Sequence, residues 1–216
     1  MSYEFGDAVP AQLPSSVKPG TNVLVTGPAM SGKRALMLDI LARGANQGDG
    51  AVVVTANDGG ATINEQFRSR VSLGETYFRI IDTVGSNPEG ELADVIHTCS
   101  SPGDLTGIGI EFSQISKEAN TTGVDRVRLA FDSLSPLLMY VELERLFRFL
   151  HVFTQQIQSN DWLGLFAIDP ESHDKQTINT INQLFDGMLE LRDDGDRREI
   201  RARGFGEAPT GWVAFD

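Results

Sequence analysis

The sequence predicts an α/β fold in which a mostly parallel, doubly wound sheet is flanked by helices. Three observations lead to this prediction. Short apolar runs alternate along the chain with longer segments of helical periodicity, which is the order that builds a parallel sheet. A glycine-bounded loop follows the first apolar run and opens a helix. Near the end of the chain, two strand-like segments flank a turn-forming stretch, which predicts an antiparallel hairpin.

The predicted strands are short runs rich in valine, isoleucine, leucine and phenylalanine, as expected for strands that are buried on both faces. In chain order they are Val23–Thr26, Ala51–Thr55, Tyr77–Asp82, Arg126–Phe131 and Trp162–Ile168. The segments between them place apolar residues on one side of a helix. The predicted helices are Gly32–Gln47, Ala61–Val71, Asp104–Ala119 and Tyr140–Ser159.

The start of the chain departs from this alternation. Residues 1–20 contain Pro10, Pro14 and Pro19 and lack a clear periodicity. We therefore expect a lead-in segment that covers the sheet edge. No composition shift, internal repeat or low-complexity segment marks a second domain, so residues 1–216 are predicted to form a single one.

The end of the chain, residues 187–216, predicts a hairpin and a short strand. Met188–Arg192 and Glu199–Arg203 read as strands on either side of Asp193-Asp194-Gly195-Asp196. Asp and Gly favour tight turns, so the two strands are expected to pair antiparallel. Gly211–Phe215 is expected to add a short final strand.

The charge balance argues against nucleic acid as a partner. The formal net charge is −12, from 30 acidic and 18 basic residues, and only four of the basic residues are lysines. Such a surface repels a phosphate backbone at long range, so we expect no nucleic-acid binding. A cytoplasm of high salt concentration accounts for the acidic surface without any function specific to acidic groups.

Cysteine content and hydropathy indicate the compartment. Cys99 is the single cysteine, which excludes an intrachain disulfide and fits a reducing environment. The N-terminus has no apolar run that reads as a signal peptide. The most apolar long segment, Leu134–Phe153, is interrupted by four charged residues and so does not read as a membrane span. We expect a soluble, cytoplasmic protein.

The strongest motif is a phosphate-binding loop. Its residues are Gly27-Pro28-Ala29-Met30-Ser31-Gly32-Lys33-Arg34, which follow a predicted strand and open a predicted helix. This spacing is that of a P-loop, in which backbone N–H groups and the helix N-terminus face the phosphates and the lysine adds a positive charge. We therefore expect all eight residues to bind a nucleotide. Arg34 is unusual, because a P-loop normally has Ser or Thr there to hold Mg²⁺.

A carboxylate at the end of a later strand is the candidate metal ligand. Asp132 ends the apolar run Val127–Asp132, and the carboxyl ends of parallel strands face the crevice in which ligands bind. It is therefore expected to hold a cation, or water bound to a cation, beside the phosphates. The alternative is that Asp132 only caps the segment before Ser133. With Arg34 in the loop, Mg²⁺ must be held by Asp132 and water, or be replaced in part by the arginine charge.

Three segments together resemble the RecA superfamily, and most of all the KaiC-like ATPases of archaea and bacteria. These segments are Thr21–Lys33, Arg126–Ser135 with its Asp-Ser-Leu-Ser ending, and Gly187–Arg192 followed by Arg201-Ala202-Arg203-Gly204. The resemblance runs from about Leu13 to the end of the chain. It implies a RecA-like P-loop fold and ATP as the nucleotide. The acidic, lysine-poor composition resembles haloarchaeal versions of the family.

The resemblance also points to an altered catalytic position. After its second strand a hydrolytic KaiC-like domain carries paired glutamates that activate the attacking water, and the matching residues here are Asn57 and Asp58. Asparagine cannot accept a proton, so Asp58 is the remaining candidate for the general base. The alternative is that Asn57–Gly60 forms only a turn. Together with Arg34, this departure predicts slow or absent hydrolysis.

Arg201 and Arg203 match the basic finger pair with which KaiC-like and RecA-like domains reach the γ-phosphate of a neighbouring subunit. Two residues apart on a strand, they project to one face. They are therefore candidate catalytic residues acting across a head-to-tail homo-oligomer, which is a contact that forms rings or filaments. The alternative is that they only balance acidic residues across the hairpin, namely Asp193, Asp194, Asp196 and Glu199.

These features predict an ATP-binding regulatory or scaffolding protein with weak or absent hydrolysis, which acts through nucleotide-dependent contacts with its own copies or with a protein partner. Three alternatives stay open at this point. The chain could be an active Mg²⁺-dependent ATPase that uses Asp58, Asp132 and the two arginines. It could be a recombinase-like DNA-binding ATPase, which the negative charge disfavours. It could also be a degenerate P-loop module that binds proteins and no nucleotide.

Overall fold

The central feature of the fold is one large sheet. A computed structural model describes residues 2–72, 76–85, 88–193, 195, 197–206 and 208–215. Within these residues the strand order in the large sheet is β11-β10-β9-β3-β8-β7-β4-β5-β6, and β1 and β2 pair separately. The strands are β1 (Tyr3–Glu4), β2 (Ser16–Val17), β3 (Asn22–Thr26), β4 (Gly50–Thr55), β5 (Phe78–Asp82), β6 (Ile96–Thr98), β7 (Val127–Asp132), β8 (Leu163–Ile168), β9 (Gly187–Asp193), β10 (Arg198–Arg203) and β11 (Val213–Ala214).

The pairing confirms a mostly parallel sheet with an antiparallel end. Strands β9, β3, β8, β7, β4, β5 and β6 run parallel to their neighbours in this order. Strand β10 pairs antiparallel with β9, with Ile200 opposite Leu191, and β11 pairs antiparallel with β10. The predicted hairpin and the short final strand are therefore confirmed, with the final strand limited to Val213–Ala214.

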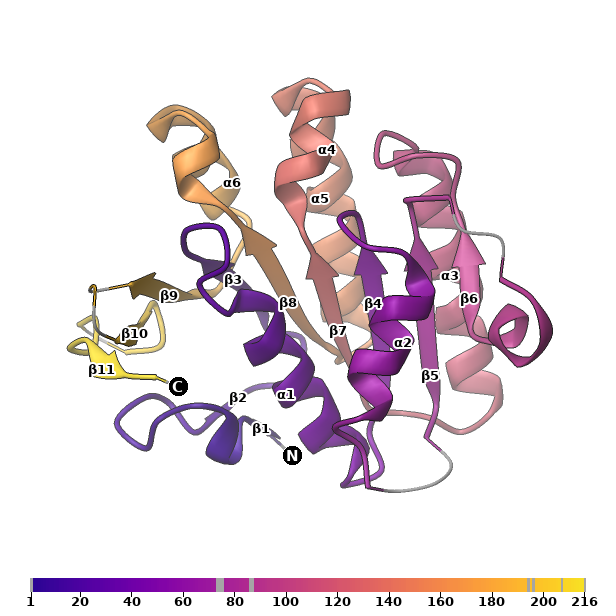
Figure 1. Ribbon diagram of the computed structural model, residues 1–216, viewed down its shortest axis with the longest axis horizontal. Helices are drawn as coiled ribbons and strands as arrows, with labels where there is room; N and C mark the ends of the chain where they lie inside the picture. Colours follow the sequence, from indigo (N-terminus) through magenta and orange to yellow (C-terminus); the bar gives the residue numbers. More distant parts are fainter. Residues whose placement is uncertain are drawn as a thin grey trace.

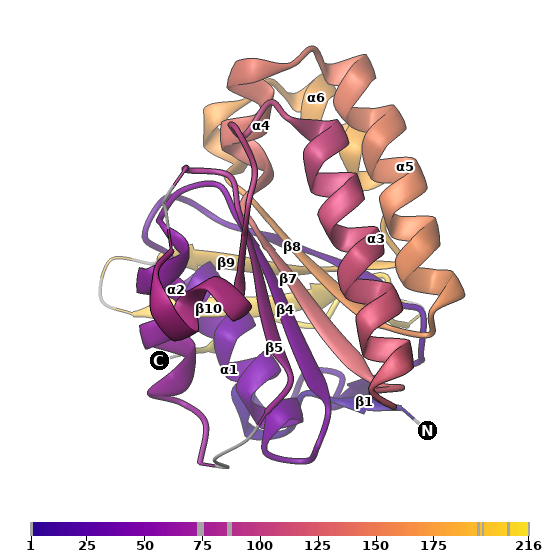
Figure 2. The same cartoon turned by 90° about the vertical axis from the view of Figure 1, so that its right-hand side faces the viewer.

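Helices cover both faces of the sheet (Figure 1). They are α1 (Lys33–Ala45), α2 (Gly60–Arg68), α3 (Leu105–Thr121), α4 (Leu134–Tyr140), α5 (Leu143–Ser159) and α6 (Lys175–Asn182), with short 3₁₀ turns η1 (Gly6–Ala8), η2 (Gly90–Asp94) and η3 (Pro170–Ser172). Figure 2 shows α1 and α2 on one side of the sheet and α3 and α5 on the other. Each side has its own buried apolar cluster, because strands buried on both faces need cover on both. No helix of the described segments is long and apolar enough to cross a membrane.

The predicted helix Tyr140–Ser159 corresponds to α5, which begins at Leu143, whereas the preceding helix α4 (Leu134–Tyr140) was not predicted. Val141 and Glu142 between them have extended backbone. Val141 is buried in the cluster on this side of the sheet, so the interruption lets an apolar side chain enter the core. Strand β6 and helix α6 were not predicted. Asp174 marks the start of α6, since its side chain accepts a hydrogen bond from the Thr177 N–H at 2.7 Å.

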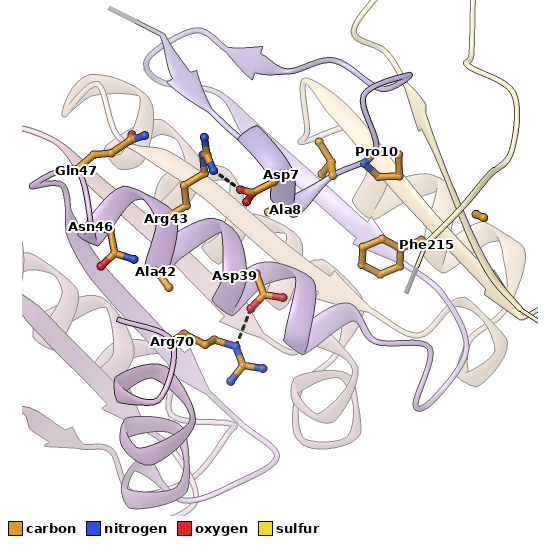
Figure 3. Close-up of a pocket in the computed structure, with 12 residues that line it drawn as sticks. Asp7, Ala8, Pro10, Asp39, Ala42, Arg43, Asn46, Gln47, Arg70 and Phe215 are labelled. Carbon is orange, nitrogen blue, oxygen red and sulfur yellow. Dashed lines mark hydrogen bonds and ion pairs between the residues drawn. The ribbon is translucent and has the colours of Figure 1, made fainter. Parts of the chain in front are cut away.

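The lead-in segment packs against α1 and also extends to the last strand of the sheet, β11. Tyr3 and Phe5 are fully buried in the same cluster as α1. Asp7 pairs with Arg43 near the C-terminal end of α1. Residues 7–10 and Phe215, which follows the last strand, line a shared pocket of about 700 Å³, and Asp7, Ala8, Pro10 and Phe215 are labelled in Figure 3. The α1 residues that line this pocket are Asp39, Ala42 and Arg43, in the central and C-terminal part of the helix, and no P-loop residue lines it. We therefore assign it no part in phosphate binding.

A buried arginine joins the lead-in segment to the sheet. Arg128, the second residue of β7, is fully buried. Its Nε donates to Asp49 at 2.8 Å, and its Nη1 donates to the carbonyl oxygens of Glu4 and Ile40 at 2.8 and 2.9 Å. The guanidinium lies against Gly44 of α1, where a Cβ atom would collide with Arg128 Nε. A close approach between α1 and β7 therefore requires glycine at this position.

We predict that Gly44→Ala lowers the free energy of unfolding by about 1–3 kcal/mol, because a methyl group there overpacks a fully buried region. The matched control is Gly109→Ala in α3, where the nearest atom, Phe149 Cε2, is 4.0 Å from the added Cβ. The control should be neutral or stabilise by up to about 1 kcal/mol, since alanine is the better helix former. Urea unfolding measures both. Equal stabilisation by the two substitutions would contradict the packing described for Arg128.

Candidate functional site

The P-loop joins β3 to α1 at the carboxyl edge of the sheet. The arrowheads of the neighbouring strands β8, β7 and β4 point to the same edge (Figure 1). Asp132 is the last residue of β7, and Asp58 lies three residues after β4 ends. The parallel order therefore brings together residues that lie 24 to 98 positions apart in the chain, as the sequence predicted for an edge of this kind.

Two glycines allow the loop to take this shape. Gly32 precedes α1 with φ +93°, in the left-handed region that glycine adopts at little cost. Gly27 has no room for a side chain, because a Cβ atom would lie 2.8 Å from the carbonyl oxygen of Leu191 in β9 and 2.6 Å from Ser31 Oγ. No side chain caps the start of α1, so its first amide groups are free of side-chain acceptors and suited to an anion.

Lys33 is folded into the P-loop. Its Nζ donates to the carbonyl oxygens of Gly27 and Pro28, each at 2.6 Å, and lies 3.4 Å from Ser31 Oγ. Burial lowers the pKa of Lys33, and Asp169 and Asp132 partly oppose that shift. The ammonium group therefore lies where the loop closes on itself, within the wall of the cavity described below.

Arg34 links the two carboxylates of the site. Its Nε donates to Asp132 Oδ2, and its Nη1 lies 2.5 Å from Asp58 Oδ2. The Asp132 side chain is only 8% exposed, whereas that of Asp58 is 43% exposed. Burial raises the pKa of Asp132, and Arg34 partly offsets the shift. Burial works against the charge of Arg34, but the two carboxylates outweigh it and raise its pKa. One guanidinium therefore contacts both acids and offsets part of their negative charge.

The loop after β4 lies beside this ion-pair cluster. Thr55 Oγ1 donates to the carbonyl oxygen of Asp58 at 2.7 Å and fixes the turn. Asn57 Nδ2 donates to Ser133 Oγ at 3.4 Å. The structure thus brings both residues of the predicted catalytic position next to Asp132. Asn57 and Asp58 lie in a bend between β4 and α2, and Gly60 is already the first residue of α2. The turn given as the alternative for Asn57–Gly60 is therefore limited to the residues before the helix.

Arg201 and Arg203 share one face of β10, as their spacing predicted. Both contact Glu190 of β9, Arg201 in a close ion pair and Arg203 at 3.3 Å. Arg201 also lies over the ring of Trp212, at 4.4 Å from its centroid. Of the carboxylates predicted to balance them, Glu199 pairs instead with Arg192, and residues 194 and 196 lie outside the described residues. Neither arginine lines the P-loop cavity, so their action on a neighbouring subunit stays a prediction.

A cavity of about 710 Å³ opens over the P-loop. Its lining includes residues of the predicted site and others from α4 and the segment after β8, namely Ala29, Met30, Ser31, Gly32, Lys33, Arg34, Asn57, Asp132, Ser133, Ser135, Pro136, Met139, Asp169, Ser172 and His173. The side chains of Met30 and Met139 are highly exposed, at 94% and 84%. Ser135, Pro136, Met139 and His173 were not among the predicted site residues. The signal available for the first three was their position just after Asp132, where α4 continues from the strand end.

Comparison with known proteins places the chain in a family and a fold. Residues 20–191 match the profile of a family described as Family of unknown function (DUF7504), so the chain belongs to that family. No curated protein matches the chain significantly in sequence. Among solved structures, the chain is similar to a KaiC-like protein from the hyperthermophilic archaeon Pyrococcus horikoshii OT3. The TM-score is 0.64 and the identity 15%, over 96% of this chain and 94% of that one. This likeness confirms the predicted RecA-like α/β fold.

The buried carboxylate makes the Arg34 ion pairs dependent on pH. We predict that Arg34→Met raises the pKa of Asp132 further, because the offsetting charge is removed. The variant then holds a proton on Asp132 at pH values where the wild type does not. Its deficit in stability is therefore small in acid and grows as the pH rises toward neutral. Near pH 7 we expect a deficit of about 1–3 kcal/mol, since a buried acid loses its partner.

Urea unfolding of both proteins between pH 4 and pH 8 measures this deficit. Arg43→Met is the matched control on the same helix, because its partner Asp7 has a side chain that is 89% exposed. The control should show little change with pH. A deficit for Arg34→Met that stays constant or shrinks as the pH rises would contradict the assigned ion pair.

Proposed function

We propose that this member of the DUF7504 family binds ATP in the cavity over the P-loop, hydrolyses it slowly or not at all, and acts as a regulatory or scaffolding protein. In this proposal the bound nucleotide favours one arrangement of the protein, which then contacts its own copies or a protein partner. The single observation that carries the proposal is the P-loop itself, with Lys33 enclosed by it and a cavity of about 710 Å³ beside it.

The chemistry of the loop supports an anionic ligand. Lys33 and Arg34 both line the cavity, and the uncapped start of α1 adds its amide groups. Phosphate groups are the anions that such a helix start and loop accept in P-loop proteins. The cavity volume lies within the range of about 300–1,000 Å³ that is typical of small-molecule sites. The fold is that of a KaiC-like protein, which favours ATP among the nucleotides.

The residues around the γ-phosphate position support slow turnover. Asn57 cannot accept a proton, and the Asp58 carboxylate is already paired with Arg34 at 2.5 Å. A base engaged in an ion pair is a poor acceptor for the proton of the attacking water. A site that keeps its phosphate loop but lacks a free base is suited to holding a nucleotide. The nucleotide would then act as a signal whose lifetime depends on dissociation.

Head-to-tail assembly is the form of contact we propose for the loaded protein. Arg203 is the last residue of β10 and has a half-exposed side chain. Arg201 lies two residues before it on the same strand. Both could turn from Glu190 to the γ-phosphate of a neighbouring copy, as the resemblance to KaiC-like domains implies. Sedimentation velocity with and without ATP measures whether the nucleotide changes the size of the assembly.

We predict that Lys33→Met weakens ATP binding by about tenfold or more, because hydrogen bonds to charged groups contribute about 1.5–3 kcal/mol each. Calorimetry in buffer of high KCl concentration measures the affinity. The matched control is Lys117→Met, which replaces an exposed lysine of α3 remote from the loop and should leave the affinity unchanged.

Phosphate release, followed in the same samples, separates the alternatives. The proposal expects binding that depends on Lys33 and almost no release. Rapid release that Asp58→Ala abolishes would identify an active ATPase and refute the proposed retention of ATP. Absence of binding by the wild-type protein would indicate a P-loop fold that serves only as an interaction module.

A further inference from the structure

We infer that Arg34 takes the place of Mg²⁺ in this site, so that the nucleotide binds as the free polyphosphate without a divalent ion. The inference rests on the proposed nucleotide function and names the form of ligand that the site accepts. It follows from the position of Arg34, from its contacts with two carboxylates and from the charges that surround it.

The residues present do not fit a bound Mg²⁺. In P-loop proteins a Ser or Thr hydroxyl after the lysine holds the ion, and a strand-end aspartate holds it directly or through water. Arg34 occupies the first position and carries only hydrogen-bond donors, so it cannot ligate a cation. The second position, Asp132, is already bound by Arg34 Nε. Across the described residues, no group of three or more His, Cys, Asp or Glu side chains is arranged to hold a metal ion.

The Arg34 guanidinium contacts the acids that would otherwise be available to a metal cation. The guanidinium lies between Asp132 and Asp58, two acids that come from the ends of different strands. A divalent ion placed against Asp132 would have to displace the guanidinium or lie close to it. Displacement breaks an ion pair to a carboxylate that is almost fully buried, and close approach sets two positive charges against each other.

Arg34 also has N–H donors that its ion pairs do not engage and that can bind phosphate. A guanidinium has five N–H donors, and the ion pairs with the two carboxylates engage Nε and Nη1. The Arg34 side chain is partly exposed and lines the same cavity as Lys33. Arginine binds phosphate with good geometry through neighbouring N–H groups. Arg34 can therefore do what the ion does in related sites, which is to connect the strand-end acid to the phosphates.

The charges of the cluster indicate which groups have to hold a polyphosphate that brings no divalent ion. Lys33 and Arg34 balance Asp132 and Asp58 when no nucleotide is bound. Asp169 and Glu171 lie close enough to Lys33 to influence its pKa, so these six residues include more acids than bases, and this excess opposes a polyphosphate that brings no divalent ion. A metal-free polyphosphate must therefore be held by the P-loop amides, Lys33 and the unused donors of Arg34.

Calorimetry with ATP in EDTA and in excess MgCl₂ tests the inference. For the wild-type protein we expect an affinity in EDTA that equals or exceeds the apparent affinity in MgCl₂, since Mg²⁺ in solution sequesters the free nucleotide. For Arg34→Thr, which restores the usual hydroxyl and frees both acids, we expect binding about tenfold weaker in EDTA than in MgCl₂. Arg43→Thr, on the same helix with its exposed partner Asp7, is the control and should behave as the wild type.

The outcomes distinguish the inference from the function on which it rests. Wild-type binding that requires MgCl₂ overturns the inference and leaves nucleotide binding intact. Absence of wild-type binding in both buffers overturns the proposed function and the inference with it. Equal behaviour of Arg34→Thr and wild type in both buffers also overturns the inference, because the arginine would then not be the cation. Should Arg34→Thr fail to fold, as judged by circular dichroism, the wild-type comparison decides alone.

Discussion

The ion pairs of Arg34 with Asp132 and Asp58 hold the carboxyl edge of the sheet together. They connect the start of α1, the end of β7 and the loop after β4. Without a cation at this point, the buried Asp132 would lie beside Asp58 with uncompensated charge, and a phosphate would add to the repulsion. Asp132 therefore depends on the arginine for its charged form. The two carboxylates in turn fix the orientation of the Arg34 side chain.

This arrangement keeps the phosphate cradle while changing the cation beside it. Gly27, Gly32 and Lys33 have the conformation and contacts expected of a P-loop. The acid next to the Asn57 position is tied to Arg34, so the group that would activate water is not free. In the proposed function, phosphate binding and phosphate hydrolysis place separate demands on this edge, and its residues provide for the first more fully than for the second. The proposed regulatory or scaffolding role rests on this division, because it requires the nucleotide to be held and not hydrolysed.

Much of the fold was predictable because parallel strands buried on both faces leave a strong pattern. The five predicted strands match β3, β4, β5, β7 and β8 to within a residue at each end. The missed elements have weaker signals. Strand β6 has three residues, Ile96–Thr98, and lies at the edge. The break between α4 and α5 depends on the burial of Val141, which periodicity within one segment does not reveal.

The residues of the site were predictable from the sequence, whereas the ion pairs between them were not. Spacing located the P-loop, and strand ends located Asp132 and Asp58. The ion pairs of Arg34 join residues up to 98 positions apart, and such contacts follow from the strand order, which local sequence does not encode. The choice of Glu190 as partner for Arg201 and Arg203 likewise depends on the register of β9 and β10. The haloarchaeal origin and the cytoplasmic location stay predictions from composition.

A crystal structure of the wild-type protein with a non-hydrolysable ATP analogue and MnCl₂ tests the central claim most directly. Anomalous scattering locates manganese independently of the protein atoms. The account predicts nucleotide phosphates in the P-loop, the Arg34 guanidinium between Asp132 and a phosphate oxygen, and no anomalous peak at that position. An anomalous peak between Asp132 and the phosphates, with Arg34 turned away from both acids, would contradict it.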